Sequence, residues 1–321
     1  FLLLFMREQS VAFYSLLALG IGTAITGMLP SVIGLYCTTV LMSLGFHYAE
    51  TIQQSLSMQL ISRERLPLVL GKQIAVSSFT GLAVLAVLFL VVQVFNLDYL
   101  WIYLLFGCIT VLLACFIYFA FPHFKGEAEQ HKTMILRQRY WLYYALTFLS
   151  GARRQIFVVF AGFLGFSIGE MSLLFLVNGV LTIYLAPRIG RLVVYWGEKR
   201  VLTLEYVGLI VIFTCYAFAE SAMFASALYI IDHVFFAMAI AIKSYFKKIA
   251  DPADMASTAG VAFSINHIAA VLLPFLLGML WIHSTALVFI AGAMIAAASL
   301  ILAQLIPGAP EQGTETVFSQ A

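Results

Sequence analysis

Long apolar runs constrain this chain more than any other feature of its sequence. Stretches of about 20 residues with almost no charge recur ten times, approximately at 11–29, 31–58, 69–94, 99–121, 141–164, 168–187, 201–219, 222–243, 257–280 and 284–306. A run of this length matches the hydrocarbon thickness of a bilayer. Because each backbone amide in hydrocarbon must be bonded within its own segment, every run is predicted to be a transmembrane helix.

The composition agrees with lipid as the solvent. Of 321 residues, 63% are apolar and 10% are charged, with a mean hydropathy of +1.02, whereas a soluble domain carries about 25% charged residues. The net charge of +2 is too small to indicate a nucleic-acid partner. The cysteines lack zinc-ligand spacing and are interpreted as small buried hydrophobes, so we expect no metal and no cofactor. They are Cys37, Cys108, Cys115 and Cys215.

Basic residues in the loops predict the orientation. Lys and Arg total 17, and all except Arg153 and Arg154 fall in or beside alternate loops. The intervening loops carry neither residue type; they lie around positions 30, 96–98, 169–170, 220 and 283. The positive-inside rule therefore places the basic loops in the cytoplasm and predicts a multi-pass protein of the cell membrane.

A polar segment at residues 122–140 separates four helices from six. We interpret it as a cytoplasmic linker between an N-terminal helical half (1–121) and a C-terminal six-helix half (141–306). Phe1 opens in the middle of an apolar run, so we expect the first half to be truncated. Residues 307–321 are polar with two glycines and two prolines, and they are predicted to form a disordered cytoplasmic tail.

The loop after the sixth run carries GRLVVYWGEKR at residues 190–200. This segment resembles the cytoplasmic loop motif G-x-L-x-D-R-x-G-x-R-R of the major facilitator superfamily (MFS), although Val194 replaces the acid and Tyr195 the next basic residue. The match is carried by Gly190, Arg191, Gly197, Lys199 and Arg200. The resemblance implies an all-α, MFS-like membrane bundle of twelve helices, of which this chain would supply helices three to twelve.

An ionisable group at mid-bilayer costs about 2.5–3.5 kcal/mol, so each one inside a run needs a reason. Run 31–58 carries polar residues spaced 4, 3, 4 and 3 apart, which places them on one helical face. These are Ser43, His47, Glu50, Gln54 and Ser57. The stripe is interpreted as lining a water-filled cavity or, alternatively, as part of a buried polar network. Glu50 is the candidate proton-carrying carboxylate, with His47 one turn away as a candidate relay.

Two adjacent arginines interrupt run 141–164. Adjacent residues point about 100° apart, and Arg154 is favoured as the cavity-facing one that holds an anionic group, with Arg153 as the other option. Asp232, in run 222–243 beside His233, is expected to partner one of them. The alternative for both sites is a fixed salt bridge between helices. The remaining candidate site residues are Asn178, Asn266 and His267.

Several classes of function lack their motifs. G-x-x-x-x-G-K-[ST] does not occur, nor does H-E-x-x-H or a T-V-G-Y-G-type filter. The sequence therefore predicts not an enzyme but a secondary active transporter in the lipid bilayer. It would move a small solute, an anion being favoured, by alternating access with proton coupling. The alternative is a non-transporting sensor or assembly protein of the same fold. The solute and the oligomeric state stay open.

Overall fold

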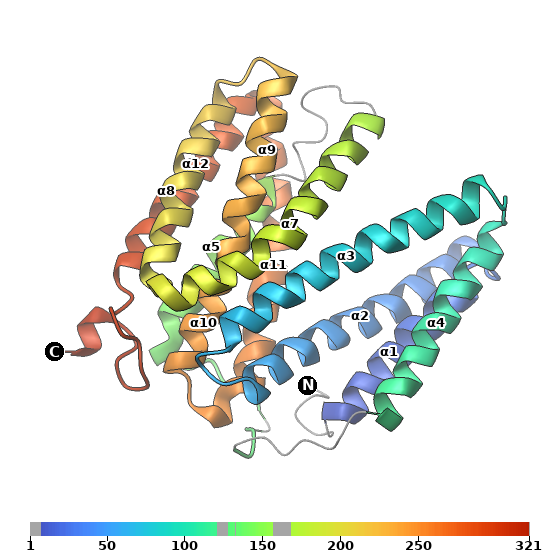
Figure 1. Cartoon of the computed structure of the whole chain (residues 1–321), viewed down its shortest axis with the longest axis horizontal. Coiled ribbons are helices and arrows are strands. Elements are labelled where there is room, and N and C mark those ends of the chain that lie inside the picture. Colours follow the sequence, from blue (N-terminus) through green and yellow to red (C-terminus); the bar gives the residue numbers. More distant parts are fainter. Residues whose placement is uncertain (1–7, 121–127, 132, 157–167, 321) are drawn as a thin grey trace. The chain divides into compact units, whose positions relative to one another are not determined.

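The described part of the chain is built from helices. The computed structural model describes residues 8–120, 128–131, 133–156 and 168–320 (Figure 1). Among these residues, nine helices are long and apolar enough to cross a membrane. The tenth expected run begins as helix α5 (Trp141–Arg154), and its continuation at 157–167 lies outside the described residues, as do Phe1 and linker residues 122–127 and 132. The all-α class is confirmed.

The described residues form two compact units, each of which gathers segments distant in sequence. The first comprises those within Phe1–Ile61, Ala83–Ile135 and Pro252–Gly260, and the second comprises those within Ser62–Leu82, Leu136–Asp251 and Val261–Ala321. The expected half boundaries at 121 and 141 stay a prediction.

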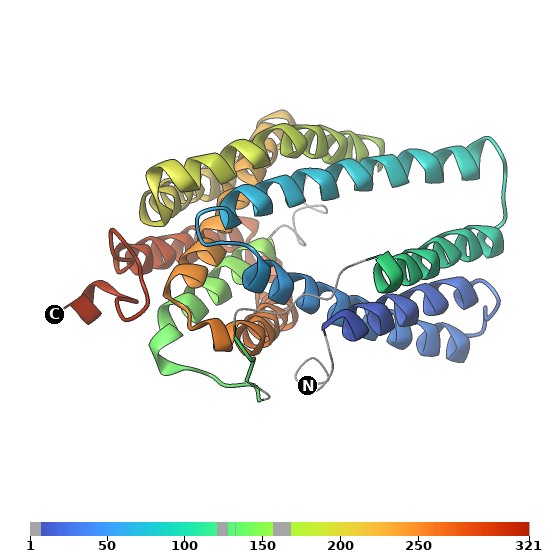
Figure 2. The same ribbon diagram turned by 60° about the horizontal axis from the view of Figure 1, so that its bottom comes forward.

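In the first unit, α1 (Glu8–Thr26) packs along both α2 (Val32–Leu60) and α4 (Tyr99–Ala120), as Figures 1 and 2 show. Glycines permit this close approach. A Cβ added at Gly45 would lie 2.5 Å from the Leu19 backbone nitrogen, and one at Gly107 would lie 2.4 Å from that of Ala24. Without a hydrophobic drive between helices in lipid, such backbone proximity is the main source of packing energy.

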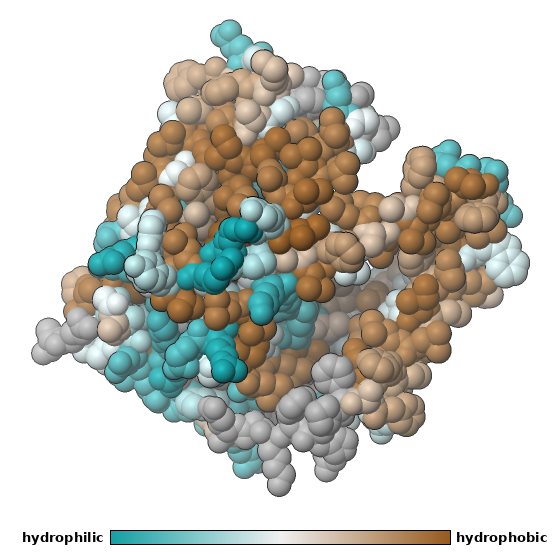
Figure 3. Space-filling model, viewed as in Figure 1, coloured by the Kyte–Doolittle hydropathy of each residue, from teal (hydrophilic) through white to brown (hydrophobic). Residues whose placement is uncertain are grey.

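The second unit contains α5, α7 (Ile168–Trp196), α8 (Glu198–Ala217), α9 (Ala222–Phe236), α10 (Ile240–Ile249) and α12 (Thr285–Gln304), with most of α11 (Met255–His283) and the first part of α3 (Leu66–Gln93). Its apolar core lies between α8, α9 and α12, where the rings of Tyr216 and Phe289 stack at 4.9 Å. The outer faces of α8 and α9 are also apolar (Figure 3), as lipid-facing surfaces should be.

Helix α7 is longer than its sequence predicts. The apolar run was expected to end at Pro187, but the helix continues to Trp196 with the proline inside it. A proline removes only one amide donor from the helix. The helix also packs closely on α3 at this point, because a Cβ on Gly71 would approach the Ala186 carbonyl oxygen to 2.5 Å. Gly190, which belongs to the segment expected to be a loop, is likewise helical and faces the Pro67 carbonyl. Only Gly197, with φ of +81°, makes the turn into α8.

The expected disordered tail is instead ordered through residue 320. Residues 311–314 form a tight turn, and Val317–Gln320 is a 3-10 helix. The buried Tyr245 hydroxyl on α10 donates to the Glu315 carbonyl, and the Val317 amide donates to the Leu305 carbonyl at 2.9 Å. Composition predicted disorder because the tail is polar, but the tail backbone is held by the Tyr245 side chain of α10 and by the Leu305 carbonyl at the end of α12.

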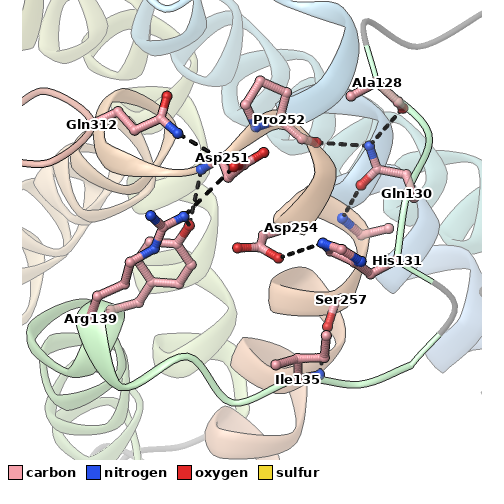
Figure 4. Close-up of polar contacts among 12 residues, drawn as sticks. Ala128, Gln130, His131, Ile135, Arg139, Asp251, Pro252, Asp254, Ser257 and Gln312 are labelled. Atoms are coloured by element: carbon pink, nitrogen blue, oxygen red, sulfur yellow. Dashed lines mark hydrogen bonds and ion pairs between the residues drawn. The ribbon is translucent and has the colours of Figure 1, made fainter.

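The linker is bonded to residues 251–257, the segment that leads from α10 into α11 and that is divided between the two units (Figure 4). In the first unit, the Gln130 side chain donates to the Pro252 carbonyl at 2.8 Å, and the Ile135 amide donates to the Ser257 hydroxyl at 2.7 Å. In the second, Arg139 lies 4.0 Å from the Asp251 carboxylate. The described part of the linker is therefore fixed by specific bonds.

Candidate functional site

Arg153 is completely enclosed in the second unit. Its guanidinium lies 3.0 Å from a Glu205 carboxylate oxygen on α8 and donates to the Ser299 hydroxyl on α12 at 2.6 Å. The ring of Tyr206 lies 4.5 Å from its Cζ atom. Arg153 and Glu205 are both 0% exposed. Since α5 is thereby tied to two other helices, the fixed ion pair between helices is the reading that this geometry supports for Arg153.

Arg154 is exposed, although the preceding residue is buried. The step of about 100° between neighbouring residues on a helix produces this difference. One turn earlier, Gly151 lies against Asn266 of α11, so closely that a Cβ there would be 2.7 Å from the amide oxygen. His267 bonds the Phe263 carbonyl of its own helix through Nδ1 at 3.0 Å. The contact between Gly151 on α5 and the predicted site residue Asn266 on α11 thus brings the two helices together.

Asp232 does not pair with an arginine, contrary to expectation. Its carboxylate contacts His233 Nδ1 at 2.6 Å and accepts a bond from the Tyr216 hydroxyl at 3.0 Å. The same Nδ1 lies 2.9 Å from the Tyr229 carbonyl. The correction has a simple reason: Arg153 is engaged by Glu205, while the residue next to Asp232 supplies a partner. An acid and an imidazole of α9 therefore meet a phenol of α8, and both helices are apolar enough to cross a membrane.

A small cavity adjoins this group, between α7 and α9. Asn178 and Thr182 line it from α7 and His233 lines it from α9. The other lining residues are Leu181, Leu185, Ile189, Ile230, Val234 and Ala237. The volume is about 10 Å³, which is close to the space that one water molecule occupies. Two of the predicted site residues, Asn178 and His233, are thus brought to one cavity.

The polar stripe of α2 forms in the first unit as the spacing predicts. His47, Glu50, Gln54 and Ser57 are half-buried, and Ser43 is exposed. Gly45 and Ile52 are on the buried face of α2, and Gly45 contacts α1. The stripe lies about 160° around the helix from these two residues. The stripe thus lies away from α1, and its role as a cavity lining stays a prediction.

The cytoplasmic loop motif has an acidic residue that the resemblance did not identify. Glu198, the first residue of α8, is 2% exposed and lies 2.7 Å from the Lys248 ammonium. It also accepts a bond from the Ser244 hydroxyl at 2.7 Å. Val194, at the motif's acidic position, is half exposed instead. The motif's basic residues Arg191 and Arg200 are exposed, and Lys199 donates to the Gln304 carbonyl at 2.7 Å.

Sequence reasoning missed Glu205 and Tyr216. Glu205 lies two turns into α8, in the apolar run 201–219. A carboxylate inside an apolar run was the available signal. Tyr216 offered none, since a tyrosine in a membrane helix is common near the interface.

The described chain is thus a multi-pass helical membrane protein with charged groups paired inside its helices. The sequence from residue 5 to 274 matches the model of the Major Facilitator Superfamily. The chain belongs to this superfamily of membrane transporters. A comparison with curated proteins finds no match.

Solved structures share the fold at low sequence identity. The E. coli fucose:proton symporter FucP is 13% identical with a TM-score of 0.76, covering 94% of this chain and 84% of its own. The human organic anion transporter MFSD10 is 13% identical with a TM-score of 0.70, covering 93% and 77%. A bacterial homologue of the iron transporter ferroportin is 15% identical with a TM-score of 0.65, covering 93% and 83%.

Proposed function

We propose that this protein is a secondary active transporter that moves a small organic anion across the membrane by alternating access, coupled to proton movement. The observation that carries the proposal is the contact between Asp232 and His233 inside α9, 2.6 Å apart. Ionisable groups within membrane helices are costly and mark solute or proton pathways by default. Two titratable groups in one hydrogen bond can take up and release a proton as a unit.

The arginines divide their roles in this proposal. Arg153 is neutralised by Glu205 at 3.0 Å and holds α5 to α8 and α12. Arg154 is exposed on the same helix and presents the positive charge that binds the solute's anionic group. A guanidinium suits this role because it stays charged at all relevant pH and can bind a carboxylate or phosphate through two parallel bonds.

The α2 stripe supplies a second proton-carrying group. Glu50 is half-buried, with His47 three residues earlier on the same face. Both positions lie in a helix of 29 residues that is apolar enough to cross a membrane. A charged carboxylate in a membrane helix is less costly when it can reach water. The water-filled cavity of a transporter would give it that access.

The test is proton flux in proteoliposomes that contain a pH-sensitive dye. Members of a panel of small carboxylates and phosphate esters are added one at a time under an imposed pH gradient. We expect at least one to change the internal pH with the native protein and with Asp98→Asn, a matched change in an exposed loop. We expect no such flux with Asp232→Asn and Glu50→Gln combined, and a raised half-saturating concentration with Arg154→Gln.

Undiminished solute-dependent proton flux in the combined variant would remove the assignment of the coupling proton to Asp232 and Glu50. An unchanged half-saturating concentration with Arg154→Gln would remove the anion assignment. If no member of the panel moved protons or solute with the native protein, the transporter proposal would give way to a non-transporting role.

A further inference from the structure

We propose that the cavity between α7 and α9 is a binding site for one water molecule, held by Asn178 and Thr182 and placed against His233. The inference deepens the proposed function, since it extends the Asp232–His233 pair by one more hydrogen-bonding group. It can fail without that function failing, because the test below needs no transport.

The first observation is a buried amide that makes no hydrogen bond of normal geometry among the described residues. Asn178 is 6% exposed, and neither its carbonyl oxygen nor its amino nitrogen has a hydrogen-bond partner at bonding distance among the described residues. Tyr229 of α9 is its polar neighbour there, but the geometry of a bond is not met. A buried amide that loses water without a replacement bond costs about 1–3 kcal/mol. Such a group in a stable helix pair calls for a ligand.

The second observation is the space beside that amide. The cavity of about 10 Å³ is lined by Asn178, and a site of that size accepts one water if two or more polar groups reach it. Three polar side chains line it: Asn178, Thr182 one helical turn later, and His233 opposite. Wholly apolar cavities stay dry, but this one presents hydrogen-bonding groups from both helices.

The chemistry of His233 fixes how that water is used. Nδ1 lies 2.6 Å from Asp232 and 2.9 Å from the Tyr229 carbonyl. Both neighbours are acceptors, so the neutral ring carries its proton on Nδ1 and Nε2 is an acceptor. A water beside the ring can donate one hydrogen to the imidazole and the other to the Asn178 oxygen. The chain of groups then runs from Tyr216 through Asp232 and His233 to the water and Asn178.

A larger or differently charged occupant fits less well. The cavity volume does not admit an organic solute, and its other walls are apolar: Leu181, Leu185, Ile189, Ile230, Val234 and Ala237. A dehydrated metal cation takes about six oxygen ligands when it binds in proteins, whereas the cavity offers two oxygen-bearing side chains. A water molecule fits the cavity volume and can form hydrogen bonds with the Asn178 amide.

The test is infrared spectroscopy of the intact protein in lipid, with exchange of ordinary water for ¹⁸O-labelled water. We expect one sharp O–H band of a buried water that shifts on exchange in the native protein. The band should be lost in Ala237→Val, which fills the cavity from the residue directly after α9 and leaves every polar group intact. It should also be lost or displaced in Thr182→Val. Thr214→Val is the matched control, because that hydroxyl is exposed and bonds its own helix at 2.7 Å.

A second readout follows the imidazole. In protein labelled with ¹⁵N at histidine, the Nε2 resonance of His233 should shift in Ala237→Val and stay in place in Thr214→Val. Native circular dichroism of both variants shows that they fold. An absent band in the native protein, or a band that survives Ala237→Val, overturns the proposal. A band that appears only in sodium and not in choline chloride overturns it too, because the occupant is then a cation.

Discussion

The buried pair of Arg153 and Glu205 makes the sharpest prediction about stability. Both side chains are 0% exposed, and their closest nitrogen and oxygen are 3.0 Å apart. Replacing Arg153 by Met leaves the carboxylate enclosed without its counter-charge. Removing one partner of a buried ion pair costs about 3–5 kcal/mol, which lowers the folding equilibrium constant by about a hundredfold to several thousandfold.

The double replacement Arg153→Met with Glu205→Leu should recover most of that loss. The pair is incompletely satisfied: Nε of Arg153 and Oε2 of Glu205 both lack a hydrogen-bond partner among the described residues. Ser299 keeps a bond to the Ile295 carbonyl at 2.8 Å without the arginine. Replacing a buried pair by apolar residues of similar volume is often neutral, or stabilising by about 1–4 kcal/mol. The double variant should therefore unfold near the native midpoint.

The assay is unfolding in mixed micelles of increasing sodium dodecyl sulfate content, followed by circular dichroism. Arg200→Met is the control, because Arg200 is exposed at the start of α8, and it should change the free energy of unfolding by less than about 0.5 kcal/mol. The reasoning is refuted if Arg153→Met is as mild as this control. It is also refuted if the double variant is no more stable than Arg153→Met.

Three further predictions concern packing and the cytoplasmic end. Gly190→Ala should lower the free energy of unfolding by about 1–3 kcal/mol, because the new Cβ would lie 2.4 Å from a backbone oxygen of α3. Gly81→Ala is the control and should be neutral or slightly stabilising, because nothing lies within 4 Å of its new Cβ. Equal thermal midpoints of the two variants would contradict this prediction. Glu198→Ala should cost about 1.5–3 kcal/mol and should cost little more on top of Lys248→Met in a double-mutant cycle; full additivity would mean that the two are not coupled. Tyr245→Phe removes a bond to the tail, so a non-specific protease should cleave the tail faster in this variant than in the native protein. An unchanged cleavage rate would show that this bond does not keep the tail ordered.

The helices were predictable because hydrocarbon allows few solutions. Runs of about 20 apolar residues must be helical in lipid, and α1, α4 and α12 follow their predicted runs to within a few residues. Helix ends were less predictable where packing overrides local preference. Pro187 did not end α7, because the helix at that point lies against the backbone of α3 through Gly71.

The partners of charged residues were not predictable from spacing. The stripe on α2 follows from helical periodicity alone, which is a local property. The pairing of Arg153 with Glu205 joins residues 52 positions apart on different helices, and only the packed structure brings them together. Asp232 had been expected to find an arginine, but His233, its neighbour in sequence, meets it first.

The adjacent arginines show how one helical step can place two charges in different surroundings. Arg153 faces inward to Glu205 and Ser299, and Arg154 is exposed. The buried pair joins α5 to α8 and α12, so a rotation of α5 about its axis would leave both charged groups enclosed without a partner, which is costly. The same interaction therefore fixes which arginine is enclosed and which is exposed, so two neighbouring charges in a membrane helix can have different surroundings.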